Sequence, residues 1–143
     1  MSASNYLENK LVDRIFRGQA LPTWGTLYVA LLTSAPSDAG MGTEVSGTGY
    51  ARKGVLSNLA NWAGTQGAGT TTASSGTSGT TSNNAAIDFG TAGSNWGLVT
   101  HWAVCDASDG GNMLVYDAFS TTKDVVTGNR VVFVKGALQI AVD

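Results

Sequence analysis

The stretch WGLVTHWAVCDASDGGNMLVYDAF, residues 96–119, predicts two β-strands joined by a tight polar turn. Apolar side chains dominate residues 98–105 and 113–119, and both runs have the length of an ordinary strand. The segment Asp106–Asn112 between them contains two consecutive glycines. Glycine and asparagine accept the positive φ angles that hairpin turns require. We therefore expect a β-hairpin, and the runs on either side of it decide the fold class.

Further short apolar runs of strand length lie on both sides of this hairpin, separated by Gly, Pro and Asn residues that favour turns. Such a succession is typical of a β-sandwich or jelly roll. We therefore predict an all-β fold, sandwich-like or jelly-roll-like. Arg52 and Lys53 are expected at an exposed strand edge. The predicted strands occupy 27–33, 50–57, 86–89, 131–134 and 137–142.

Residues 4–17 predict one N-terminal amphipathic α-helix. Leu7, Leu11 and Ile15 recur every fourth residue, with Val12 and Phe16 beside them, which gives a continuous apolar stripe. Ser4 or Asn5 caps the start of this helix, and Gly18 follows its end. We expect the stripe to pack on the body of the protein or on a neighbouring subunit.

The length of 143 residues predicts a single domain, 1–143, with the sandwich spanning 26–142. Within it, residues 64–84 consist of Gly, Ala, Thr, Ser, Asn and Gln, without any charge. Such a tract buries too little apolar surface to offset the entropy lost on ordering. We therefore expect a flexible excursion, ordered only by pairing or packing against a neighbouring subunit.

The composition narrows the class of partner. The formal net charge of −2 argues against nucleic acid, because nucleic-acid-binding proteins usually present a basic surface. No stretch approaches the ~20 apolar residues that span a membrane. Only 13% of the residues are charged, which is a poor surface for a free monomer. We therefore expect much of the surface to be covered by other subunits. The single cysteine excludes an internal disulfide.

The residues that carry chemistry do not form a catalytic set. His101 and Cys105 lie four positions apart on one predicted strand, which separates their backbones by about 13 Å. A nucleophile and its base must approach to hydrogen-bond distance. The acidic residues of 106–112 lack the spacing of a calcium loop and fit a turn better. We predict a protein that is not an enzyme, with no catalytic, cofactor-binding or metal-binding residues.

The four tryptophans suggest either stacking on sugar rings or packing in a core or interface. Their scattered positions favour packing. Together with the helix stripe they supply the candidate interface residues. These are Leu7, Leu11, Ile15, Phe16, Trp24, Trp62 and Trp96.

Several blocks in order resemble a family of small bacteriophage virion proteins commonly labelled tail-fibre proteins. The resemblance runs from residue 5 to about residue 142, and the uncharged tract at 64–84 departs from the family pattern as an extension. The blocks are NYLENKLVD (5–13), TLYVALLTSAPSDAG (26–40), TEVSGTGYAR (43–52), WGLVTH (96–101) and DASDGGN (106–112).

The resemblance implies a structural protein on the virion surface, assembled in the cytoplasm of the bacterial host. The chain has no repeat from which a long shaft is built. The first hypothesis is therefore a capsid decoration or cement protein that stabilises the head by bridging major capsid subunits. Because homo-oligomers have symmetric, closed interfaces, such a protein is expected to be a homo-dimer or homo-trimer at a local symmetry axis. The alternative is a tail-fibre or tail-tip module that binds host glycan.

Overall fold

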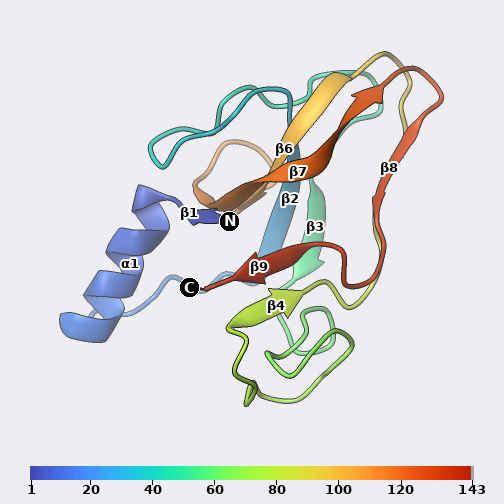
Figure 1. Cartoon of the computed structure of the whole chain (residues 1–143). Helices are drawn as coiled ribbons and strands as arrows, with labels where there is room; N and C mark the ends of the chain where they lie inside the picture. The colour runs from blue at the N-terminus through green and yellow to red at the C-terminus, as the bar shows by residue number, and fades with distance from the viewer. Residues whose placement is uncertain (143) are drawn as a thin grey trace.

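The computed structural model describes residues 1–142, which form one α-helix and nine β-strands. Figure 1 shows the strands gathered into one body, with the helix standing at its side. In chain order the elements are β1 (Ser2–Ala3), α1 (Asn5–Phe16), β2 (Thr26–Leu32), β3 (Lys53–Leu56), β4 (Thr80–Ser82), β5 (Ile87–Thr91), β6 (Gly97–Cys105), β7 (Met113–Val125), β8 (Arg130–Phe133) and β9 (Gln139–Ala141).

The strands form three antiparallel sheets. The largest has the order β1-β7-β6-β2-β3, and two smaller ones pair β4 with β9 and β5 with β8. In the centre of the large sheet, β6 pairs with β2 along one edge and with β7 along the other. The predicted hairpin is confirmed, since Cys105 of β6 lies opposite Met113 of β7.

One apolar core joins the three sheets, so the fold is all-β and sandwich-like, as predicted. Side chains alternate along the strands, as they do when a sheet covers a core with one face. The core contains Val29 and Leu31 of β2, Val99 and Val104 of β6, Phe89 of β5, Phe133 of β8 and Ile140 of β9.

The opposite face of β2 and β6 is buried as well. Ala30 and Leu32 join Ala103, Cys105 and Met113 in a second cluster, on which Met41 and Tyr116 pack. Both faces of β2 are therefore covered by apolar side chains.

Helix α1 begins one residue after the predicted start. Ser4 caps it, because its Oγ accepts a hydrogen bond from the Leu7 backbone N–H at 3.3 Å and donates one to the Met113 carbonyl. At the other end Gly18 adopts a φ of 68°, and the Gln19 N–H donates to the Asp13 carbonyl. Both ends follow the sequence prediction. The helix is 12 residues long, and no helix of the described chain is long and apolar enough to cross a membrane.

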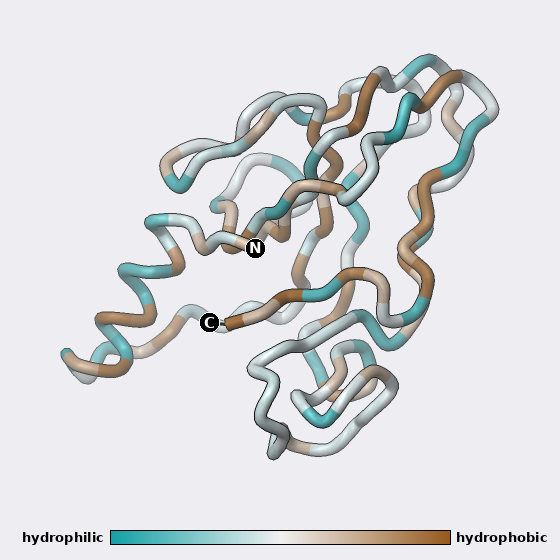
Figure 2. Tube along the Cα trace, in the orientation of Figure 1, coloured by the Kyte–Doolittle hydropathy of each residue, from teal (hydrophilic) through white to brown (hydrophobic). Residues whose placement is uncertain are grey.

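The apolar stripe of α1 is largely uncovered by the rest of the chain. Leu7 packs against the core, but no residue of the helix is buried. Ile15 is 66% exposed and Phe16 is 79% exposed. Figure 2 shows the apolar residues of α1 on a helix that stands apart from the strands. The stripe therefore packs on the body only through Leu7, and its packing on a neighbouring subunit stays a prediction.

The predicted strands differ from the structure mainly at their ends. The strand expected at 50–57 is reduced to β3, and β7 continues to Val125, six residues beyond its predicted end. Sequence patterns gave no indication of β1 and β4. These strands are two and three residues long, and each depends on a partner distant in sequence.

The uncharged tract 64–84 folds back on itself in the structure. Gln66 Nε2 donates to the Ala73 carbonyl at 2.6 Å, and the Gly64 N–H donates to Thr70 Oγ1 at 2.9 Å. The end of the tract forms β4 against β9. Its flexibility remains a prediction.

Asn83, directly after β4, is fully buried and holds the small sheets together. Its Nδ2 donates to the Ala85 carbonyl at 2.8 Å and to the Val134 carbonyl at 3.0 Å. Its Oδ1 accepts from the Leu138 N–H at 2.9 Å. One side chain therefore satisfies backbone groups of the segments that connect β4, β5, β8 and β9.

We expect Asn83→Ala to lower the free energy of unfolding by about 3 kcal/mol, because several buried backbone groups lose their partner. Urea unfolding followed by tryptophan fluorescence measures this change. Asn9→Ala, at an exposed position of α1, is the control and should have little effect. Equal stability of the two variants would contradict the role assigned to Asn83.

Candidate functional site

The turn Asp106–Asn112 is closed by its own side chains. The Asp106 carboxylate accepts hydrogen bonds from the Asn112 N–H at 2.6 Å and from Asn112 Nδ2 at 2.8 Å. Gly110 and Gly111 have φ angles of 59° and 69°, as a turn of this kind requires. At Gly111 a Cβ would lie 2.5 Å from the Asp106 carboxylate, so the turn requires glycine there. Both Asp106 oxygens are thus engaged within the turn.

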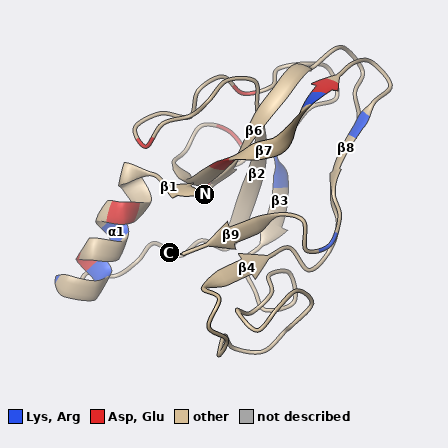
Figure 3. Cartoon of the chain, in the orientation of Figure 1, with Lys and Arg blue, Asp and Glu red and all other residues tan. Residues whose placement is uncertain are grey.

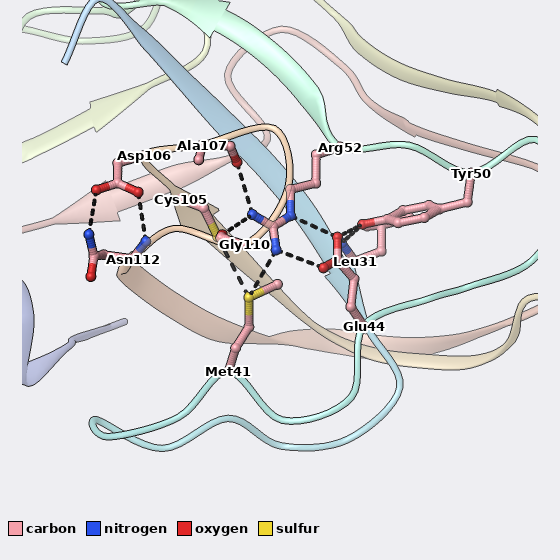
Figure 4. A network of polar contacts seen from close by, with 10 residues as sticks. All are labelled: Leu31, Met41, Glu44, Tyr50, Arg52, Cys105, Asp106, Ala107, Gly110 and Asn112. Atoms are coloured by element: carbon pink, nitrogen blue, oxygen red, sulfur yellow. Dashed lines mark hydrogen bonds and ion pairs between the residues drawn. The ribbon is translucent and has the colours of Figure 1, made fainter.

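Arg52 enters this turn and fixes it to the preceding loop. Its Nε and Nη2 donate to the two carboxylate oxygens of Glu44 at 2.9 and 2.8 Å. Its Nη1 donates to the carbonyls of Ala107 and Gly110, both at 2.9 Å. Figure 4 shows the guanidinium between Glu44 and the turn. A planar guanidinium suits this arrangement, because its Nε–Nη2 edge donates to both oxygens of one carboxylate while Nη1 donates to backbone carbonyls.

The burial of Arg52 corrects the sequence prediction. An exposed strand edge was expected, whereas the Arg52 side chain is only 5% exposed. Residue 52 lies just before β3. Two of its partners, the Ala107 and Gly110 carbonyls, lie 55 and 58 residues further along the chain. The only indication in the sequence was the order of residues in the block TEVSGTGYAR, which contains both Glu44 and Arg52.

Tyr50 extends the network into the core. Its hydroxyl donates to Glu44 Oε1 at 2.7 Å and accepts from the Leu31 N–H at 3.0 Å. Its ring stacks on Phe89 and meets Trp96 edge-on. Burial, together with the neighbouring Glu44 carboxylate, raises the pKa of the Tyr50 hydroxyl far above its ordinary range. The hydroxyl therefore stays protonated and acts as a structural donor.

The only histidine and the only cysteine have separate partners. His101 Nδ1 lies 2.8 Å from Thr100 Oγ1. The Cys105 thiol is fully buried and lies 3.7 Å from Met41 Sδ. Burial raises the pKa of Cys105 from 9.0 to about 11, which suppresses the reactive thiolate. The residues of the Arg52 network and of β6 thus serve structure.

A second feature is an apolar cavity of about 510 Å³ between α1 and the body. Leu7, Trp24, Leu27, Trp62 and Ile140 are among its lining residues. The indole N–H groups of Trp24 and Trp62 are buried and have no hydrogen-bond partner within the described chain. The fold thus leaves two apolar features open, this cavity and the exposed half of α1.

The candidate interface residues fall into three groups. Leu7, Trp24 and Trp62 line the cavity. Ile15 and Phe16 are exposed on the second half of α1. Leu11, midway along the helix, is half-buried. Trp96 differs, because it is 4% exposed and lies in the core. Its Nε1 donates to the Thr48 carbonyl at 3.0 Å. Trp96 therefore presents no surface to a partner.

A family model described as "Podophage GP4 fiber I protein gp80" matches residues 2–141. The chain belongs to this family. The match spans the helix, all three sheets and the uncharged tract, so membership applies to the whole described fold. The resemblance to phage tail-fibre proteins is thereby confirmed, and the chain is a phage structural protein. No curated protein sequence matches it.

We expect Arg52→Ala to lower the free energy of unfolding by about 3 kcal/mol, because it leaves a partly buried carboxylate and two carbonyls without their donor. Arg52→Lys should recover only part of this loss, since lysine lacks the fork. Arg130→Ala is the matched control. Arg130 pairs with Asp88 on the surface, where the Arg130 side chain is 58% exposed, and such pairs contribute about 0–1 kcal/mol. If urea unfolding shows that Arg130→Ala lowers the free energy of unfolding as much as Arg52→Ala does, the structural role assigned to Arg52 is contradicted.

We expect the raised pKa of the Cys105 thiol to lower the free energy of unfolding at alkaline pH. An unfolded chain releases the thiol proton near pH 9.0, whereas the folded protein retains it until about pH 11. Between these values the unfolded state binds fewer protons, so the free energy of unfolding falls as pH rises. The total loss is about 2–3 kcal/mol. Unfolding curves across this range should fall more steeply for the wild type than for Cys105→Ala, and parallel curves would contradict the prediction.

Proposed function

We propose that this chain is a non-enzymatic structural subunit of a podophage tail fibre, held in the virion by contacts with other virion proteins. The observation that carries the proposal is the match to a podophage fibre family over residues 2–141. The polar network supports a structural role, because its charged groups and its hydroxyl are all hydrogen-bonded within the chain. These belong to Glu44, Tyr50, Arg52 and Asp106.

The shape supports a module within a fibre and not its shaft. A long shaft is built from repeats, and this chain forms one sandwich-like body with a single helix at its side (Figure 1). Such a body fits a fibre base, joint or tip.

The uncharged part of the surface is a reasonable site of attachment to other virion proteins. Residues 54–87 carry no charged side chain, and Figure 3 shows the loops around β4 without any Lys, Arg, Asp or Glu. Hydroxyl and backbone groups there can pair with a neighbour without the cost of desolvating charges. This region includes exposed Leu56 and Leu59, which are 56% and 55% exposed.

Decoration of the capsid is the second candidate. The sequence favoured it because a short chain without repeats suits a clamp on the head. The match to a fibre family supports a tail location at least as well, and a glycan-binding tip is a special case of the fibre proposal.

Immunogold labelling of intact particles tests the proposal. We expect label at the tail fibres and none on the head, with an antibody against the major capsid protein as the control for head labelling. Label spread over the head would overturn the fibre assignment in favour of decoration. Soluble chain that competes for the antibody should abolish the signal, which establishes specificity.

A further inference from the structure

The apolar cavity of about 510 Å³ beside α1 connects the core of the protein with its surface. Three of its lining residues, Val104, Val115 and Ile140, belong to the apolar core that joins the sheets. Leu59 lines it as well and is 55% exposed. A packed core leaves few voids larger than a water molecule, whereas an apolar hollow of several hundred Å³ is the usual form of a binding site.

Two indole N–H groups in the lining of this cavity lack a hydrogen-bond partner. Trp24 and Trp62 both line the cavity, and their Nε1 atoms are buried without any acceptor within the described chain. Nearly all buried polar groups in proteins are paired, because an unpaired donor has lost its bond to water and gained nothing in return. Trp96 is paired in this way, since its Nε1 donates to the Thr48 carbonyl at 3.0 Å. The two unpaired donors indicate that the cavity receives a group with a hydrogen-bond acceptor.

The absence of charge restricts the chemistry of that group. Every lining residue that the structure describes is uncharged. A phosphate, a carboxylate or an ammonium group would lose its hydration there without gaining an ion pair. A polypeptide segment fits better, because each of its apolar side chains is flanked by backbone carbonyls, which are strong neutral acceptors. A phospholipid also supplies an acyl chain and ester carbonyls, but its phosphate meets no cation in the lining.

We propose that this cavity binds an apolar, uncharged segment of a neighbouring virion polypeptide. One leucine-sized or aromatic side chain of that segment fills the cavity, and the adjacent backbone carbonyls accept hydrogen bonds from Trp24 and Trp62. Neither indole nitrogen is accessible to solvent in the structure, so the rings rotate toward the cavity as the side chain enters. Tryptophans that surround a central pocket are typical of the residues that dominate the energy of an interface.

The surface around the cavity has the same uncharged character. Ser57, Asn58 and Thr81 line the cavity and belong to the region 54–87, which carries no charged side chain. The cavity thus marks one point within that region at which a neighbour is anchored. The anchor rests on the proposed attachment to other virion proteins, and it adds to that proposal a site and the chemistry of its occupant.

Titration of the full chain with N-acetyl-leucine-N′-methylamide, followed by NMR, tests the site. This probe carries one apolar side chain between two peptide carbonyls. In proton–nitrogen correlation spectra we expect the indole N–H signals of Trp24 and Trp62 to move downfield as hydrogen bonds form, while the signal of Trp96 stays in place. Single Trp→Phe variants assign the signals. N-acetyl-lysine-N′-methylamide, whose side chain is charged, is the control probe and should bind about tenfold more weakly.

A substitution at the exposed side of the cavity tests the same site in the protein. Leu59→Asp should weaken binding of the leucine probe about tenfold, because it places a carboxylate beside the apolar side chain. Val134→Asp is the matched control, since Val134 is 63% exposed and does not line the cavity, and it should bind the probe as the wild type does. In phage particles that carry each variant, Leu59→Asp should be depleted relative to Val134→Asp.

Four results would overturn the proposal. These are unchanged Trp24 and Trp62 signals at tens of millimolar leucine probe, equal binding of the lysine probe, equal behaviour of Leu59→Asp and Val134→Asp, and tighter binding of monomeric dihexanoylphosphatidylcholine, which would assign the cavity to a lipid. None of the probe measurements depends on where the chain lies in the particle. Failure of the anchor is therefore distinguishable from failure of the fibre assignment, which immunogold labelling decides.

Discussion

The pairing of β6 along both of its edges is the constraint on which the rest of the molecule depends. With β2 on one side and β7 on the other, its backbone groups are satisfied and its side chains enter two separate apolar clusters. Because β6 ends at Cys105, the turn that follows is held at a fixed place. That turn presents the Ala107 and Gly110 carbonyls to Arg52.

The Arg52 network fixes the 106–112 turn against the loop that contains Glu44. A buried ion pair adds little net stability compared with apolar packing, but breaking it is costly, so it fixes one arrangement of the chain. Here it joins β2, the loop that contains Glu44 and the 106–112 turn through Tyr50 and Arg52. The Glu44, Tyr50 and Arg52 side chains are all engaged in hydrogen bonds of this network. A virion component benefits from such rigidity, because its contacts with neighbours are then made without further ordering of loops.

Helix α1 behaves in the opposite way. It is anchored through Ser4 and Leu7 and then leaves the body with its apolar stripe open to solvent (Figure 1). The sandwich thus buries the apolar side chains of its strands in one core, whereas the helix leaves most of its own apolar side chains exposed.

The sequence by itself determined the helix, the 106–112 turn and most of the strands, because these depend on neighbours a few residues apart, whereas the short strands β1 and β4 depend on distant partners. Apolar runs of strand length marked the 98–105 and 113–119 strands, and paired glycines marked the turn between them. Only the tertiary structure decided the fate of single side chains whose partners are distant. Arg52 is buried because Ala107 and Gly110, 55 and 58 residues away, meet it. Trp96 belongs to the core, while Ile15 and Phe16 remain exposed, for the same reason: packing between segments distant in sequence covers some apolar residues and leaves others open to solvent.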